Sequence, residues 1–168
     1  YQCHTYGLQL FVPCSGTGNN NTQKYYFRSS MGGAVVLGWE LNGTYNNAPF
    51  NLVQAHEDIA EFKTLRPYFY GDFYPLTEYS TSDEAWAAFQ WNRPEERDGI
   101  VLAFRRHQAP QSSIAIVLHE LVADGDYEVT FEDYGITLFK SGRELGSELS
   151  VKIPEAPGSL LIRYRRVR

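Results

Sequence analysis

Cysteine is scarce in this chain, with Cys3 and Cys14 the only two among 168 residues. They form no Cys-x-x-Cys pair and no histidine cluster supports them, so neither a zinc site nor a disulfide framework is indicated. We therefore expect two buried thiols, no metal ion and no cofactor.

Long apolar runs and an excess of positive charge are also lacking. No apolar run approaches the roughly 20 residues that a membrane span requires. The 15 Lys and Arg residues are outnumbered by 20 Asp and Glu residues, and the net charge of -5 argues against nucleic acid or an anionic membrane as the partner. No signal-peptide pattern is present. We expect a cytoplasmic protein that binds neither nucleic acid nor membrane.

Two common catalytic motifs are missing as well. There is no Gly-x-Ser-x-Gly elbow, because Ser15 and the Gly16-Thr17-Gly18 loop lack the strand-elbow-helix context that it needs. Gly-rich phosphate loops are absent too. Esterase-type and nucleotide-dependent chemistry therefore have little support.

Aromatic residues are abundant, at 15 % of the chain, and they gather in one run. Residues 68–74 hold five aromatic rings and Asp72, with Gly71 near the centre and Pro67 and Pro75 at the edges. Proline and glycine at these positions predict an ordered irregular connection rather than a core strand. Aromatic faces beside a fixed carboxylate suit sugar rings, whereas the simpler interpretation is that the rings cement a domain junction.

The first part of the chain predicts alternating strands and helices. Residues 4–13 predict a strand, a helix capped by Asn21 or Thr22 extends to about Ser30, and the apolar run 34–41 predicts a strand buried on both faces. Asn51 caps a helix that Pro67 ends. The charged residues expected on its outer face are Glu57, Asp58, Glu61 and Lys63.

The period changes after residue 78, where short strand candidates alternate with turn residues. The candidates are residues 85–92, 99–106, 113–121, 126–132, 135–139, 148–153 and 158–166. Such a series predicts an antiparallel β-sandwich. The expected fold class is therefore α+β, with a β/α segment at 1–78 that includes the aromatic junction, followed by a sandwich at 79–168.

Asp72 is the first candidate for acid–base chemistry. Packing among Tyr70, Phe73 and Tyr74 would desolvate the carboxyl and raise its pKa toward the range of a general acid. The alternative is an Asp that follows a glycine and accepts backbone N–H groups in a turn.

Glu40 is the second candidate, because it ends the predicted strand 34–41, where parallel α/β sheets place their sites. A loop-facing Glu without a role is the alternative. Sugar-contacting side chains would come from the aromatic and histidine residues nearby, namely His4, Tyr6, Trp39, Tyr70 and Tyr74.

The order of several motifs resembles a known family. The motifs are Gln2-Cys3-His4-Thr5-Tyr6-Gly7-Leu8, Gly16-Thr17-Gly18, Phe27-Arg28-Ser29 with Met31-Gly32, Leu37-Gly38-Trp39-Glu40, Tyr70-Gly71-Asp72-Phe73-Tyr74-Pro75-Leu76-Thr77, Ala85-Trp86 with Phe89-Gln90, and Gly142-Arg143-Glu144-Leu145. Together they resemble the C-terminal part of clan D α-galactosidases, glycoside hydrolase family 36 and close relatives. The resemblance implies that residues 1–66 are the end of a (β/α)8 barrel and that a β-sandwich follows.

The chain departs from that family in its chemistry. Retaining glycosidases need two carboxylates about 5–5.5 Å apart, and the family's Lys-Trp-Asp nucleophile motif and its acid/base motif do not occur here. One hypothesis is a glycosidase with a relocated carboxylate pair, drawn from Glu40, Asp72, Glu57 or Asp58. The alternative is a non-catalytic carbohydrate-binding or structural module.

The predicted strands of the first part of the chain indicate association with a second copy. Strands at 4–13 and 34–41 would leave unpaired edges and an uncovered apolar face. We expect residues 1–66 to pair with the same segments of another copy, giving a homodimer or a higher homo-oligomer. The alternative is that these strands fold back on the sandwich.

Overall fold

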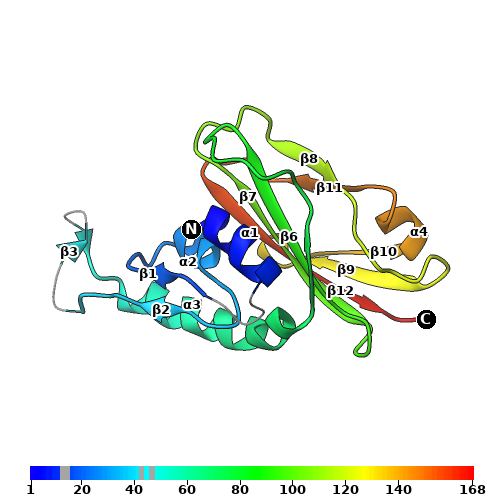
Figure 1. Ribbon diagram of the computed structural model, residues 1–168, viewed down its shortest axis with the longest axis horizontal. Coiled ribbons are helices and arrows are strands. Elements are labelled where there is room, and N and C mark those ends of the chain that lie inside the picture. The colour runs from blue at the N-terminus through cyan, green and yellow to red at the C-terminus, as the bar shows by residue number, and fades with distance from the viewer. Residues whose placement is uncertain (12–15, 42–43, 46–47) are drawn as a thin grey trace. The chain divides into compact units, whose positions relative to one another are not determined.

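The computed structural model describes residues 1–11, 16–41, 44–45 and 48–168. The chain forms two compact units, Tyr1–Tyr70 and Gly71–Arg168, here named the N-terminal unit and the sandwich unit (Figure 1). The fold is α+β, as predicted. The boundary predicted after residue 78 falls later in the chain than this division. None of the described helices is long and apolar enough to cross a membrane.

The N-terminal unit contains a parallel β/α/β arrangement. Strands β1 (Gly18–Asn19) and β2 (Val36–Leu37) pair in parallel, and helix α2 (Lys24–Ser29) connects them. The other elements are α1 (Gln2–Phe11), β3 (Thr44–Tyr45), β4 (Ala48–Pro49), α3 (Leu52–Leu65) and the 3-10 helix η1 (Arg66–Tyr70). A strand, a helix and a parallel strand in succession are what the end of a β/α barrel would supply.

The strand predicted at residues 4–13 was wrong, because residues 2–11 form helix α1. Its buried positions are Gln2, Thr5 and Gln9, which have helical spacing but are all polar. Gln2 Nε2 donates to Ser29 Oγ at 3.0 Å, and Thr5 Oγ1 donates to the Ser29 carbonyl at 3.2 Å. Hydrogen bonds rather than apolar contacts hold this helix in place. The pattern of apolar residues therefore indicated a strand where the chain forms a helix. Residues 12–13 of that prediction, and Cys14, lie outside the described residues.

The buried strand predicted at residues 34–41 was also largely wrong. Only Val36 and Leu37 are in a strand, and Val36, Leu37 and Leu41 are 62 %, 43 % and 63 % exposed. A continuous apolar run predicts burial only where other layers cover both faces. Within the described part of the chain, the strand that pairs with this segment is β1, which has two residues.

Helix α3 confirms the prediction of a helix from Asn51 to Pro67. Asn51 Oδ1 accepts the Gln54 N–H at 3.0 Å, as expected of an N-cap. The prediction that the charged residues of this helix face outward was wrong in part. Asp58 is buried, and Glu61 forms a salt bridge with Arg28.

The irregular connection predicted for the aromatic run was wrong as well. Tyr68 to Tyr70 lie in η1, and strand β5 (Asp72–Pro75) pairs with β6 (Trp86–Arg93) at the edge of the sheet. Proline is tolerated on an edge strand, and Gly71 is required because an added Cβ would overlap the Asn92 carbonyl oxygen.

The sandwich unit confirms the predicted series of antiparallel strands. One sheet has the order β10-β9-β12-β7-β6-β5, and the opposing layer is the pair β11-β8 (Figure 1). The remaining strands are β7 (Asp98–Arg105), β8 (Ser113–Ile116), β9 (Asp126–Phe131), β10 (Ile136–Ser141), β11 (Leu149–Lys152) and β12 (Gly158–Arg166), with η2 (Glu132–Tyr134) and α4 (Gly142–Leu145) between them.

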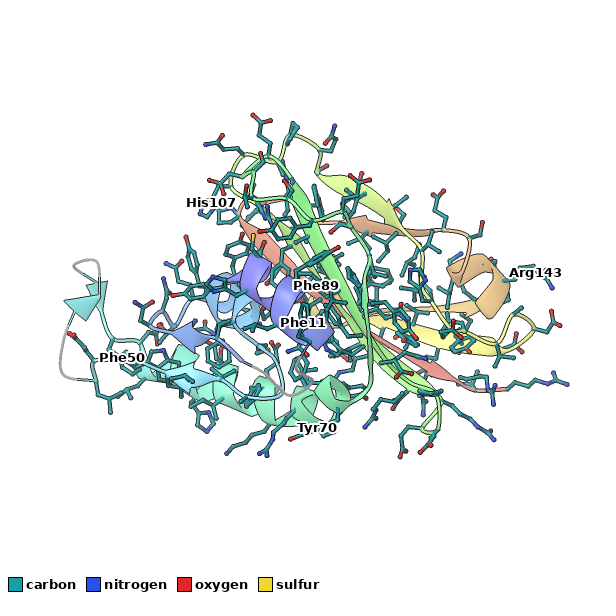
Figure 2. All side chains as sticks on the ribbon, viewed as in Figure 1. Phe11, Phe50, Tyr70, Phe89, His107 and Arg143 are labelled. Atoms are coloured by element: carbon teal, nitrogen blue, oxygen red, sulfur yellow. The ribbon has the colours of Figure 1, made fainter. Side chains whose placement is uncertain are left out.

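The core of this unit lies between its two layers. Buried side chains of the six-stranded sheet meet those of the opposing pair, and they include Ala88, Val101, Val129, Leu160, Ile162, Ile116, Leu149 and Val151. The other face of the large sheet carries a cluster of aromatic rings, which includes Phe73, Phe89, Trp91 and Phe104 (Phe89 in Figure 2). Apolar residues on both faces keep the central strands β6 and β7 buried.

Candidate functional site

The predicted site residues are divided between the two units. His4, Tyr6, Trp39, Glu40 and Tyr70 belong to the N-terminal unit, whereas Asp72 and Tyr74 belong to the sandwich unit.

Trp39 is part of an aromatic cluster in the N-terminal unit. Its ring centroid lies 5.8 Å from that of Phe27 and 5.4 Å from that of Phe50, and its indole N–H donates to Asn19 Oδ1 at 3.0 Å. Glu40, next in the chain, is exposed. The neighbours of Trp39 thus fix its ring, and the adjacent carboxylate faces solvent.

The remaining predicted residues of this unit lie on two other elements. His4 is exposed and Tyr6 half-buried on α1, and Tyr70 is 57 % exposed at the end of η1 (Figure 2). The prediction that Tyr70 packs around Asp72 has no support in its exposure.

A buried charged cluster lies between α2 and α3. The Arg28 side chain is only 1 % exposed, and its Nε and Nη2 donate to the two carboxylate oxygens of Glu61 at 2.7 and 2.6 Å. Asp58 is 2 % exposed, and Gln54 Nε2 donates to its Oδ1 at 3.0 Å. Among the described residues, Asp58 Oδ2 has no hydrogen-bond partner. Burial, and to a lesser extent the Glu61 charge, raises the pKa of Asp58 to about 6, against the opposing effect of the Gln54 hydrogen bond.

A second constellation occupies the open edge of the sandwich unit. Asp72 and Tyr74 are two residues apart on β5 and so lie on one face of the strand. The Tyr74 ring stacks on the His119 ring, with centroids 5.2 Å apart and planes inclined by 15°. Glu120 follows His119 in the segment after β8. We name Asp72, Tyr74, His119 and Glu120 the edge site.

Buried polar side chains hold the edge site from beneath. Gln90, which pairs with Tyr74 across the strands, donates to the His119 carbonyl at 3.0 Å and accepts the His119 N–H at 2.8 Å. Tyr164 donates to Asn92 Oδ1 at 2.8 Å and accepts from Gln90 Nε2 at 2.8 Å. Gln90, Asn92 and Tyr164 are at most 3 % exposed. Such a satisfied network is rigid, because breaking any part leaves a buried polar group without its partner.

The charges of the edge site act on Tyr74. Desolvation raises the pKa of the Tyr74 hydroxyl, and the negative charges of Asp72 and Glu120 raise it further. Burial likewise raises the pKa of Tyr164, which remains a neutral hydrogen-bond donor. Two carboxylates therefore lie near one phenol.

The predicted environment of Asp72 was wrong in both of its versions. Asp72 is exposed rather than packed among rings, and it lies in strand β5 rather than in a turn. Its predicted catalytic role, like that of Glu40, stays a prediction.

Sequence reasoning missed His119 and Glu120 and the three residues beneath them. A signal existed, because Gln90 and Asn92 are polar residues at alternate positions of a strand whose other inward positions, Trp86 and Ala88, are apolar. Polar residues on a core face need partners, and here the partners lie in the segment after β8.

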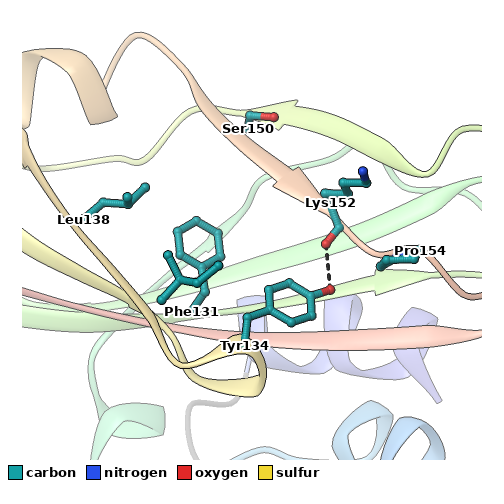
Figure 3. A pocket seen from close by; sticks show the side chains of 7 residues that line it. Phe131, Tyr134, Leu138, Ser150, Lys152 and Pro154 are labelled. Atoms are coloured by element: carbon teal, nitrogen blue, oxygen red, sulfur yellow. Dashed lines mark hydrogen bonds between the residues drawn. The ribbon is translucent and has the colours of Figure 1, made fainter.

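A third feature is an apolar groove between β10 and β11, with a cavity volume of about 390 Å³ (Figure 3). The Tyr134 hydroxyl crosses it and donates to the Lys152 carbonyl at 2.8 Å. The lining residues are Phe131, Tyr134, Ile136, Leu138, Ser150, Lys152 and Pro154. No carboxylate is among them, so the groove does not supply glycosidase chemistry.

The described part of the chain has no candidate metal site. Residues 1–11, 16–41, 44–45 and 48–168 contain no group of three or more His, Cys, Asp or Glu side chains placed to hold a metal ion.

Comparison with known proteins gives a likeness in structure. No protein-family model matches the sequence, and no curated protein matches it. The galactosidase domain of the α-galactosidase-sucrose kinase AgaSK superposes with a TM-score of 0.66 and 20 % identity over 97 % of this chain and 24 % of that one. The α-galactosidase from Lactobacillus brevis gives a TM-score of 0.65 and 15 % identity over 85 % of this chain and 20 % of that one.

A third structure is the GH36 α-galactosidase AgaA from Geobacillus stearothermophilus, with a TM-score of 0.56 and 21 % identity over 78 % of this chain and 18 % of that one. The chain thus spans less than a quarter of the length of these structures. The likeness establishes the fold, which is that of a segment of GH36 α-galactosidases and is consistent with the predicted C-terminal segment.

Proposed function

We propose that this chain is the carbohydrate-contacting C-terminal part of a glycosidase-related protein that acts on small glycosides. The observation that carries the proposal is the likeness to α-galactosidase structures over 97 % of the chain. The chain covers only 24 % of that structure and lacks the motifs for both catalytic carboxylates, so we do not propose classical α-galactosidase chemistry for it.

Hydrolysis by a relocated pair would use Asp72 and Glu40. Both are exposed, as a pair that meets a substrate must be. They would need to lie about 5–9.5 Å apart in one cleft, within one chain or between two copies. The alternative is a non-catalytic sugar-binding module, and the edge site favours it, because an aromatic pair beside two carboxylates can bind a sugar without cleaving it.

The experiment that separates the two is hydrolysis of nitrophenyl α- and β-glycosides, with galactosides first. If the pair is catalytic, Asp72→Asn and Glu40→Gln each lower turnover by about 100-fold or more, the range for loss of a general acid or base. Asp83→Asn and Glu95→Gln, which change exposed carboxylates outside the predicted pair, are the matched controls. No turnover above a mock purification would reject the relocated pair and leave the binding module.

We further propose that the chain forms a homodimer through residues 1–66. The predicted strand edge at 4–13 does not exist, but α1 exposes Leu8, Leu10 and Phe11, the last by 86 %. We expect light scattering to give a dimer that Leu10→Glu and Phe11→Glu together convert to a folded monomer. Leu52→Glu with Val53→Glu, at exposed positions on α3, tests whether that face contributes as well. A monodisperse wild-type monomer would contradict the proposal.

A further inference from the structure

The segment after β8 is held more firmly than an ordinary surface loop. The Leu118 N–H donates to the Leu145 carbonyl at 3.0 Å, the His119 main chain is bound on both sides by Gln90, and the Val122 N–H donates to the Tyr127 hydroxyl at 2.9 Å. Asn92 Nδ2 also points to the Glu120 carbonyl, at 3.5 Å. Side chains from β6 and β9 thus fix a segment that joins no neighbouring strands.

Glu120 adopts a backbone conformation that is uncommon for residues other than glycine. Its φ is 55°, in the left-handed region that favours glycine. Arg97 has a similar φ of 61°, but it lies in the tight connection between the paired strands β6 and β7, where such a residue is common. Glu120 is not in a hairpin, so its positive φ has no such explanation. Strained backbone that the surrounding structure holds in place is often found at functional sites.

The segment after β8 places His119 and Glu120 beside Tyr74 of β5. The exposed His119 ring stacks on Tyr74, and the Glu120 charge lies close enough to act on the Tyr74 hydroxyl. The site thus has an exposed ring supported by a second ring, with one carboxylate from β5 and one from the segment after β8. A sugar ring needs these two elements, an apolar platform for its C–H face and acceptors for its hydroxyls.

We propose that the edge site is a non-catalytic subsite for one neutral pyranose ring, which lies on His119 and donates hydroxyls to Asp72 and Glu120. This inference rests on the proposed carbohydrate function but not on hydrolysis. The network of Gln90, Asn92 and Tyr164 is its rigid floor, which lowers the ordering cost of binding. An exposed site of one ring and two acceptors predicts weak binding, with a dissociation constant of about 1 mM.

The test is titration of the intact chain with methyl α-D-galactopyranoside, methyl α-D-glucopyranoside and glucosamine, followed by NMR of the histidine ring signals. We expect a neutral sugar to shift the His119 signals. Followed through the proton signals of the sugar itself, His119→Ala should weaken binding by about 2- to 12-fold, which corresponds to the about 0.5–1.5 kcal/mol of a stacked ring. His107→Ala, at an exposed histidine in another loop (Figure 2), is expected to bind as the wild type does.

Glu120→Gly separates binding from folding. Glycine is free of strain at a φ of 55°, so this variant should be as stable as the wild type or more stable, yet bind sugar at least about threefold more weakly. Glu95→Gly, at an exposed turn, should leave binding unchanged.

Four outcomes would overturn the inference: no shift with any sugar, equal binding by Glu120→Gly and the wild type, binding that Tyr134→Phe in the groove abolishes, or binding of glucosamine alone, which would indicate a cation site. Sugar binding without hydrolysis would leave the inference standing while the relocated pair fails. Hydrolysis without shifts at His119 would do the reverse.

Discussion

Asp58→Asn is expected to stabilise the N-terminal unit at neutral pH and to remove most of its pH dependence between pH 4 and 7. Asp58 is buried, and its carboxyl carries a pKa of about 6 against an ordinary 3.8. Between these values the folded state keeps the proton that the unfolded chain has lost, so stability falls as pH rises through this window and stays low above it. The difference corresponds to about 3 kcal/mol at pH 7.

Asparagine keeps the acceptor for Gln54 Nε2 and carries no charge, so the variant should recover about 1–3 kcal/mol at pH 7, less the cost of its buried amide donors. At pH 4 the two proteins should have similar stability. Urea unfolding followed by helical circular dichroism measures both effects. Glu57→Gln changes an exposed carboxylate on the same helix and is the control. Parallel pH profiles of wild type and Asp58→Asn would show that Asp58 does not carry the effect.

Buried polar and charged side chains also explain why the secondary structure of the N-terminal unit was predicted poorly. Its packing depends on polar side chains such as Gln2, Thr5, Arg28 and Asp58, which hydrophobic periodicity assigns to the surface. The apolar residues Leu8 and Val36 lie exposed instead. The period of apolar residues therefore indicated strands where the chain forms a helix and a two-residue strand. Helix α3 was predictable because its Asn51 cap and Pro67 stop act locally.

The strands of the sandwich unit were predictable from the sequence because they bury apolar residues between two layers. Val129 and Phe131 on β9, and Leu149 and Val151 on β11, are buried at alternate positions, which is the period that the sequence shows. The edge site was only half predictable. Asp72 and Tyr74 stood out by composition, whereas His119 and Glu120 come from a segment that only tertiary hydrogen bonds to Gln90 and Asn92 bring to them.

Gly99→Ala is expected to destabilise the sandwich unit and to disable the edge site together. Gly99 on β7 pairs with Asn92 on one side and Tyr164 on the other. A Cβ at this position would overlap the Tyr164 hydroxyl and lie 2.6 Å from the Trp91 carbonyl oxygen. Because Tyr164 is 2 % exposed, its ring has no free space to move into, and its hydroxyl must leave the hydrogen bonds to Gln90 and Asn92.

Overpacking costs about 1–3 kcal/mol and each buried polar group that loses its partner about 1–3 kcal/mol, so we expect a loss of about 3–5 kcal/mol in urea unfolding of the sandwich unit. Gly7→Ala is the matched control, since no atom lies within 4 Å of its added Cβ, and alanine in a helix should stabilise by up to about 1 kcal/mol. The sugar-induced shifts at His119 should disappear in Gly99→Ala even where the unit is still folded. If the variant kept both its stability and those shifts, the network beneath the edge site would not be the support that positions His119, and the rigidity assigned to it would be wrong.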